Sequence, residues 1–232
     1  IKDSYFEYGA ELGLRIPGGA VSTIIPAEKR HLRSETQFSL KFNSQERPEF
    51  ERQLLSASWS YLWSRKETMQ HKFDLLDLSY IYVPWISDTF KREYLDSISN
   101  RNSILKYNYE NLFIMNWSYQ FVYNSRSLGN SASNYGTNAY TIRLGIETAG
   151  NLLYGLSSAS SMKRNADNQY TLFGIAYAQY AKLDFSFCKS FLINNNNSFA
   201  MRAGFGIAAP YGNSDILPYE KRYFSGNDYF DR

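Results

Sequence analysis

The sequence predicts an all-β protein whose antiparallel strands form part of a transmembrane β-barrel. Two observations support this prediction. Apolar and polar residues alternate over runs of about ten residues, and the chain is rich in aromatic residues without being hydrophobic overall. Aromatic residues make up 17% of the 232 residues, with 20 Tyr and 16 Phe, while the mean hydropathy is −0.46. This combination is typical of a barrel with aromatic girdles, an apolar outer surface and a polar lumen.

The alternation predicts individual strands. Between 55 and 63 the odd positions are apolar or aromatic, whereas the even positions hold serine until Leu62. Between 113 and 123 the odd positions are again apolar, and the opposite face is polar except at Ile114 and Val122. Shorter runs alternate in the same way at 38–42, 140–147 and 199–207. Because successive side chains of a strand point to opposite faces, each run indicates a strand.

We predict about nine strands from this pattern: 4–16, 35–45, 51–64, 70–83, 104–124, 138–148, 151–160, 170–190 (divisible into two) and 198–209. Turn residues separate them, as in Pro17-Gly18-Gly19 and the four asparagines from Asn194. A short helix is expected from Thr89 to Ser97 within a polar loop. The polar faces carry mainly Ser, Asn, Gln and Gly, which favours a hydrated lumen over the charged exterior of a soluble β-sandwich. A soluble protein with long strands is the alternative.

The residue inventory gives little support to catalysis or nucleic-acid binding. The net charge is +3, and no basic run is interleaved with stacking aromatics. Cys188, His31 and His71 are widely spaced and form no metal-binding set. Neither histidine lies in a motif with a serine nucleophile. The sequence therefore predicts no enzymatic activity, no catalytic residues, no metal and no cofactor.

The C-terminal part of the chain resembles a known family. Strand-like segments at 178–184 and 202–206 precede Ala208-Ala209-Pro210-Tyr211-Gly212-Asn213, and the chain continues as Leu217-Pro218-Tyr219-Glu220-Lys221-Arg222-Tyr223-Phe224-Ser225-Gly226. This part resembles the barrel of the BamA/TamA superfamily of bacterial outer-membrane assembly factors (bacterial surface antigen barrel). It is most similar to the TamA-like lipoprotein branch, where a pYGNs-type turn leads into LPyEKrfFaGG. Segments 9–18 and 141–153 resemble earlier strands, but only 177–226 is highly specific.

The resemblance implies a barrel of about 16 strands, of which residues 1–209 would supply strands and loops. Residues 210–232 would begin the long extracellular loop that folds into the lumen. The motif that leads into this loop corresponds to Arg222, Tyr223, Phe224 and Gly226. Asn227 stands where a second glycine is expected, and no Val-Arg-Gly motif follows. We therefore expect the loop tip and further strands to be missing from this chain, or the tail to be discontinuous.

Three charged residues at polar-face positions are candidate lumen anchors for this loop: Arg143, Glu147 and Arg202. Each could hold the inward-folded loop through charge-assisted hydrogen bonds; an ordinary hydrated wall is the alternative. Gly204 and Gly206 lie within a strand pattern, where glycine permits close backbone approach, rather than in a phosphate-binding loop.

The function implied by the resemblance is assembly or insertion of outer-membrane proteins, or a related protein translocation. It would act by strand pairing and local destabilisation of the bilayer, in the bacterial outer membrane. The implied partners are unfolded outer-membrane clients, outer-membrane lipid, and assembly partners in the periplasm or inner membrane; no nucleic acid is expected. The alternatives are a passive pore or receptor barrel, a barrel enzyme acting on lipids, and a soluble secreted β-protein.

Overall fold

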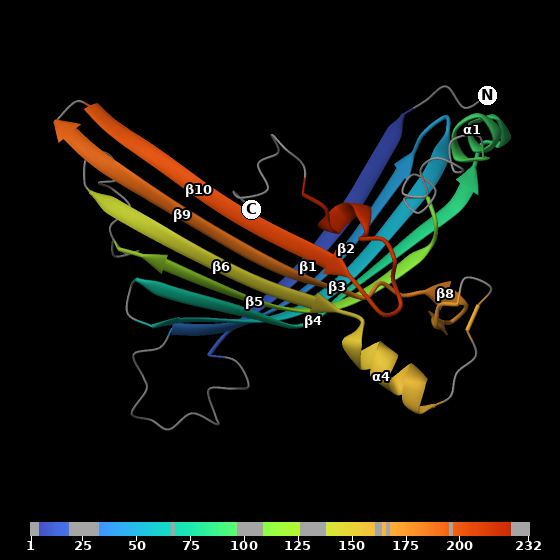
Figure 1. Cartoon of the computed structure of the whole chain (residues 1–232), viewed down its shortest axis with the longest axis horizontal. Coiled ribbons are helices and arrows are strands. Elements are labelled where there is room, and N and C mark those ends of the chain that lie inside the picture. The colour runs from blue at the N-terminus through green and yellow to red at the C-terminus, as the bar shows by residue number, and fades with distance from the viewer. Residues whose placement is uncertain are drawn as a thin grey trace.

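The alternating segments form one large antiparallel sheet in the computed structural model. The structure describes residues 5–18, 33–65, 68–96, 109–125, 138–160, 164–165, 168–194 and 197–223. The eight strands of the sheet follow the order β1-β2-β3-β4-β5-β6-β9-β10, and the sheet is strongly curled (Figure 1). The fold is therefore mostly β, as predicted from the alternation.

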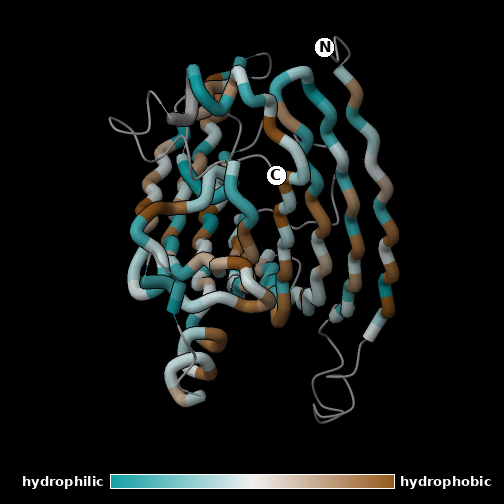
Figure 2. The backbone as a smooth tube through the Cα atoms, turned by 90° about the vertical axis from the view of Figure 1, so that its right-hand side faces the viewer, coloured by the Kyte–Doolittle hydropathy of each residue, from teal (hydrophilic) through white to brown (hydrophobic). Residues whose placement is uncertain are grey.

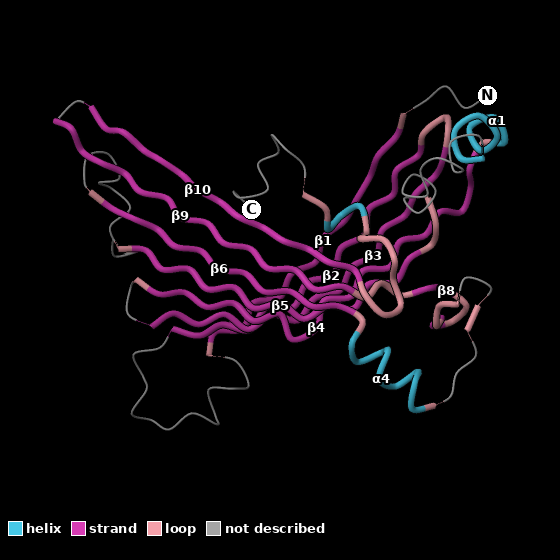
Figure 3. The backbone as a smooth tube through the Cα atoms, viewed as in Figure 1, coloured by secondary structure: helices cyan, strands magenta, loops and turns pink. Residues whose placement is uncertain are grey.

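The sheet contains β1 (Phe6–Pro17), β2 (Arg33–Glu46), β3 (Phe50–Arg65), β4 (Met69–Ile86), β5 (Leu112–Asn124), β6 (Ala139–Ala149), β9 (Tyr180–Asn194) and β10 (Asn197–Pro210). A small separate hairpin pairs β7 (Thr171–Leu172) with β8 (Ile175–Ala176). Two helical segments lie beyond the strand ends (Figure 3): α1 (Asp88–Phe90) with a π-helical turn (Lys91–Asp96), and α4 (Asn151–Ala159). A 3-10 turn (Tyr219–Lys221) lies over the concave side of the sheet. The helix expected near 89–97 is thus present.

The strand predicted at 151–160 is wrong, because this segment is the helix α4. Gly150, before it, has a φ of 74°, which turns the chain out of the sheet. A Cβ at this position would collide with the carbonyl of Ala178. The predicted strand 170–190 is also corrected: the segment begins as the small hairpin, and β9 starts only at Tyr180.

The strand register sorts side chains into a polar face and an apolar face. One rung of paired residues crosses the whole sheet on the polar face: Arg15, Gln37, Ser60, Asp74, Ser118, Glu147, Lys182 and Ala208. The neighbouring rung lies on the apolar face: Ile16, Thr36, Tyr61, Phe73, Tyr119, Ile146, Leu183 and Ile207. Figure 2 shows the same alternation as hydrophilic and hydrophobic bands along each strand.

A β-bulge in β4 keeps both of its aspartates on the polar face. Asp74 and Asp77 are three residues apart in the sequence, so a regular strand would place them on opposite faces. Instead, Leu75 and Leu76 together stand opposite one residue of β5, since Asp74 pairs with Ser118 and Asp77 pairs with Asn116. The extra residue shifts the alternation of β4 by one position, so that Asp77 returns to the face that carries Asp74.

On the polar face, short side chains of neighbouring strands form hydrogen bonds with one another. Ser39 and Ser58 hydroxyls lie 2.6 Å apart, and those of Ser56 and Ser79 lie 3.2 Å apart. The apolar face is exposed: Leu12 is 73% and Phe205 59% exposed. An exposed apolar surface of this extent marks contact with a membrane or with another protein.

The described strands form an open sheet. β1 pairs with β2 and β10 pairs with β9, and each leaves its other edge unpaired among the described residues. In this part of the chain no helix is both long and apolar enough to cross a membrane.

A buried cluster lies at one end of the polar side, where β6 is linked to β9. It consists of Ile81, Leu112, Ile114, Ala149, Ala178 and Tyr180, with Leu54 and Leu217 packed against it. Ile114, which interrupts the polar alternation of β5, is only 2% exposed. The interruption therefore marks the place where the chain after β10 packs on the sheet.

We expect Ile114→Ala to lower the free energy of unfolding by about 2–5 kcal/mol, because it removes buried contacts and leaves a cavity. Phe173→Ala is the matched control, since Phe173 is 95% exposed and its truncation should change stability by less than about 0.5 kcal/mol. Urea unfolding in detergent micelles, followed by tryptophan fluorescence, measures both. An equal loss of unfolding free energy in the two variants would contradict the burial of Ile114 in this cluster.

Candidate anchoring site for the C-terminal segment

The residues after β10, 211–223, fold back onto the polar side of the sheet and are called the C-terminal segment below. They begin with a buried turn in which Asn213 is 4% exposed. Its amide nitrogen donates to the carbonyls of Tyr170 and Tyr177, both at 3.0 Å. Its Oδ1 accepts the Tyr170 N–H at 2.6 Å. The turn is thereby fixed to the chain that leads into β9.

Gln179 provides the second set of contacts to this turn. Its side-chain oxygen accepts a hydrogen bond from the backbone N–H of Asn213 at 2.8 Å. The backbone N–H of Gln179 donates to the Ser214 hydroxyl at 2.8 Å. Gly212 has a φ of 63°, and a Cβ there would collide with the Gln179 side chain. The Tyr-Gly-Asn-Ser turn noted in the sequence therefore has a structural reason for each of its last three residues.

Beyond the turn, the C-terminal segment packs on the buried cluster and then extends two charges toward the sheet. Pro218 is fully buried, and Leu217 contacts the cluster. The 3-10 turn that follows presents Glu220, which forms an ion pair with Arg52 of β3. Lys221 Nζ lies 2.6 Å from Glu147 Oε1 of β6. The segment is thus bound to strands far apart in the sheet.

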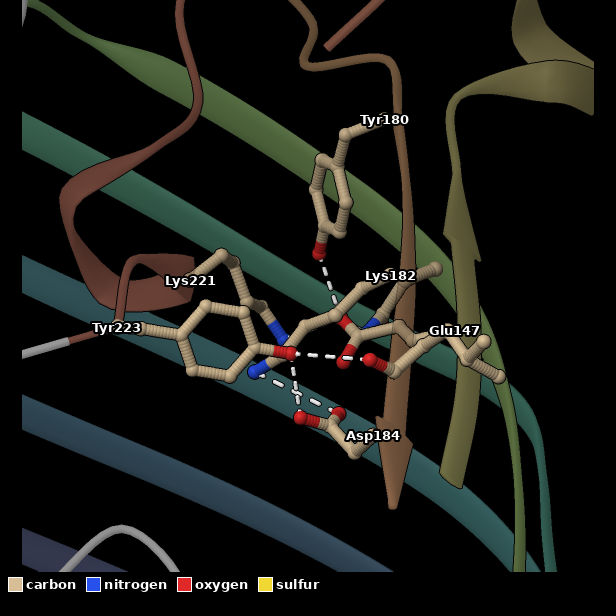
Figure 4. A network of polar contacts seen from close by, with 8 residues as sticks. Glu147, Tyr180, Lys182, Asp184, Lys221 and Tyr223 are labelled. Atoms are coloured by element: carbon tan, nitrogen blue, oxygen red, sulfur yellow. Dashed lines mark hydrogen bonds and ion pairs between the residues drawn. The ribbon is translucent and has the colours of Figure 1, made fainter. Parts of the chain in front are cut away.

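Glu147 is the centre of the polar network in Figure 4. Its Oε1 accepts hydrogen bonds from Asn116 Nδ2 at 2.7 Å and from the Tyr180 hydroxyl at 2.5 Å, in addition to the contact with Lys221. Groups from β5, β9 and the C-terminal segment therefore converge on one carboxylate oxygen. Charge-assisted hydrogen bonds are stronger than neutral ones, so this carboxylate is well suited to hold the segment.

Tyr223 makes the last described contact of the segment. Its hydroxyl donates to the Asp184 carboxylate, and Lys182 Nζ lies 4.5 Å from its ring centroid. Its ring lies against Gly206, where a Cβ would come within 2.5 Å of it. Burial, together with the hydrogen bond to Asp184, raises the pKa of Tyr223, so the neutral phenol is the form that docks.

The structure brings together two of the predicted site residues, Glu147 and Tyr223, through Lys221 and the adjoining side chains. Arg222 lies in the same segment, and its Nε donates to the Leu217 carbonyl at 2.8 Å, which closes the turn. Arg143 and Arg202 are exposed on the polar face, toward the other end of their strands. Phe224 and Gly226 lie outside the described residues.

Sequence reasoning missed several contributors to this site: Arg52, Asn116, Tyr180, Lys182 and Asp184. A usable signal was present, because all five are polar residues on the polar face of a strand. Their meeting with the segment depends on long-range packing that strand periodicity does not encode.

The arrangement suits the binding of a peptide segment, because its contacts join the C-terminal segment to the sheet. Among the described residues no group of His, Cys, Asp and Glu side chains could hold a metal ion. His71 lies on the apolar face, where it stacks on Trp63 with ring centroids 4.9 Å apart. Its Nδ1 lies 2.7 Å from the Tyr119 hydroxyl. His31 is outside the described residues.

Comparison of the chain with protein-family models, with curated proteins and with solved structures gives no match. The family resemblance of the C-terminal part therefore stays a prediction from the residues quoted for it.

Replacing Asn213 with Asp should destabilise the buried turn. The substitution keeps an acceptor for the Tyr170 N–H but removes the donors to two carbonyls, and each unsatisfied buried group costs about 1–3 kcal/mol. Ser158→Ala, at an exposed position, is the control. Thermal unfolding in detergent measures the effect, and an unchanged midpoint for Asn213→Asp would contradict the hydrogen-bonded turn.

Gly206→Ala should displace Tyr223, because the added methyl group overlaps its ring and such overpacking costs about 1–3 kcal/mol. Trypsin should then cleave after Lys221 and Arg222 faster than in the parent protein. Gly13→Ala in β1 is the control, since a Cβ there meets nothing within 4 Å. Equal cleavage rates in the two variants would show that Tyr223 does not depend on Gly206.

Proposed function

We propose that this protein is part of an outer-membrane β-barrel that assembles or inserts other outer-membrane proteins, or performs a related protein translocation, without covalent chemistry. The observation that carries the proposal is the C-terminal segment, which is bound across the polar face by contacts to β3, β6, β9 and β10. In the family that the sequence resembles, the corresponding loop folds into the lumen.

A location in the outer membrane is supported by the two faces and the strand lengths. The apolar face is exposed over every strand of the sheet, while the polar face carries short hydrogen-bonded side chains. β3 has 16 residues and β5 has 13, more than the ~9–11 that a tilted strand needs to cross a bilayer. Unpaired edges cannot face hydrocarbon, so further strands would have to complete the wall.

Assembly is favoured over passive transport because a peptide segment already covers part of the polar face. In the proposed barrel this segment, held by several charged contacts, would narrow the lumen. Client strands would be added at the seam between the first and last strands of the complete barrel, where backbone groups are available for pairing. A client strand paired at a barrel edge would be held in register while it enters the bilayer.

A passive pore or receptor barrel is the second candidate, and one observation favours it. Beside the C-terminal segment, the polar face has an open groove of about 360 Å³. It is lined mainly by serine hydroxyls of β2, β3 and β4, with Asp74, Asp77 and two lysines. Such a wall is suited to hydrated solutes.

The test uses the full-length protein in liposomes, to which an unfolded barrel client is added. Conversion of the client to its heat-modifiable folded form is followed on a gel, and we expect faster folding than in empty liposomes. Lys221→Ala should reduce the acceleration roughly tenfold, as expected from the loss of about 1.5 kcal/mol of a charge-assisted contact. Arg222→Ala should act in the same direction, because it loosens the turn.

Lys41→Ala is the matched control, since Lys41 is an exposed lysine of the polar face that pairs with Glu11 of β1. It should leave the acceleration unchanged. No acceleration with several clients, combined with steady ion conductance in planar bilayers, would contradict the assembly function and support the pore or receptor.

A further inference from the structure

The helix α4 differs from a typical surface helix because it contains no charged residue. Its sequence is Asn-Leu-Leu-Tyr-Gly-Leu-Ser-Ser-Ala. Leu152 and Leu156, one turn apart, are 41% and 58% exposed. Gly155 and Ala159 share this face and are also exposed. A helix face that is exposed and wholly uncharged is unfavourable in water and typical of a surface that meets an apolar medium.

The opposite side of α4 is packed against the protein. Ser157 is buried and accepts a hydrogen bond from the Tyr177 hydroxyl at 3.3 Å. The Tyr154 ring meets the Tyr170 ring edge-on, with centroids 5.6 Å apart. These contacts fix which face of the helix is exposed.

The start of α4 is also fixed. Gly150 N–H donates to the Met115 carbonyl at 2.9 Å. The Asn151 side chain is held by Thr148 at 2.6 Å and by the Tyr211 hydroxyl at 2.6 Å. The direction in which α4 leaves the sheet is therefore set by hydrogen bonds at its first turn.

This direction takes α4 toward the apolar side of the sheet. Leu152 and Leu153 share a small cleft with Met115 and Trp117, which belong to the apolar face of β5. In Figure 1, α4 extends from the end of β6 away from the concave side that holds the C-terminal segment. The exposed leucines thus continue the apolar face beyond the strand ends, next to a tryptophan of the kind that marks membrane interfaces.

We propose that α4 lies in the interface of the bilayer that surrounds the barrel, with Leu152 and Leu156 inserted at the boundary between headgroups and acyl chains. The inference rests on the proposed membrane location. The occupant is lipid rather than a second protein, because the helix face continues the surface that lipid would cover. The helix would be about 13 Å long and would lie along the surface rather than span it.

The hairpin β7–β8 supports the same placement. It packs against the protein-facing side of α4 through Tyr170, and Phe173 at its tip is 95% exposed. Arg164, whose guanidinium lies 4.6 Å from the Tyr170 ring centroid, provides a cation beside the helix. An aromatic tip and a nearby cation suit an anionic headgroup layer.

The test places a fluorescent label on single cysteines, in a Cys188→Ser background of the full-length protein. The protein is reconstituted in phosphatidylethanolamine–phosphatidylglycerol vesicles that contain lipids brominated on the acyl chains. Leu156→Cys reports on the exposed face of α4. Ser158→Cys, exposed on a different side of the same helix, is the matched control, and Leu183→Cys on the apolar face of β9 reports on insertion of the sheet.

We expect bromolipid to quench the label at 156 to an extent comparable to that at 183, and roughly twofold or more above that at 158. Quenching at 183 with no excess at 156 over 158 would overturn this inference and leave the membrane location standing. A label at 156 shielded from both bromolipid and aqueous iodide would overturn it in favour of a protein partner. Absence of quenching at 183 would overturn the membrane location and, with it, this inference.

Discussion

The two-residue period of the strands, kept in register across the sheet, is the constraint on which the rest of this structure depends. Each rung stays on one face of the sheet from β1 to β10, so a shift of one strand by one residue would bring Ser60 or Glu147 to the apolar face. The bulge at Leu75 shows how strict this constraint is. The chain inserts an extra residue in β4 rather than place Asp74 or Asp77 on the wrong face.

Some exceptions to the alternation occur where another part of the chain meets the sheet, and others line a cleft. Ile114 interrupts the polar face of β5 because Leu217 and its neighbours cover that end. Gly206 leaves the space that the Tyr223 ring occupies. Leu62 and Val122 interrupt the same face at the other end, where they line a cleft together with Gln70 and Gln120. Several apolar positions of the polar face therefore coincide with the packing of the C-terminal segment or with a cleft.

Much of the fold could be predicted from the sequence, because strand periodicity is local and the strands are long. The segment 151–160 could not, since its apolar residues fit either element and the deciding event is the left-handed turn at Gly150, where a Cβ would collide with the Ala178 carbonyl. Glu147 could be selected as a charge on a polar face. Its partner Lys221, and the pairing of Arg52 with Glu220, depend on how the sheet curls, which no single strand pattern contains.

The C-terminal segment also links β3 to the neighbouring strands β6 and β9, from which β3 is separated by β4 and β5. Glu220 is bound to β3, Lys221 to β6 and Tyr223 to β9. These three side-chain contacts therefore extend across the concave side of the curled sheet. Each contact requires its strand at a fixed distance from the segment. Docking of the segment and curvature of the sheet are therefore coupled: the bound segment favours the curled form, and its release would allow β3 to move relative to β9. In the proposed barrel, this coupling would connect the position of the C-terminal segment to the separation of the first and last strands.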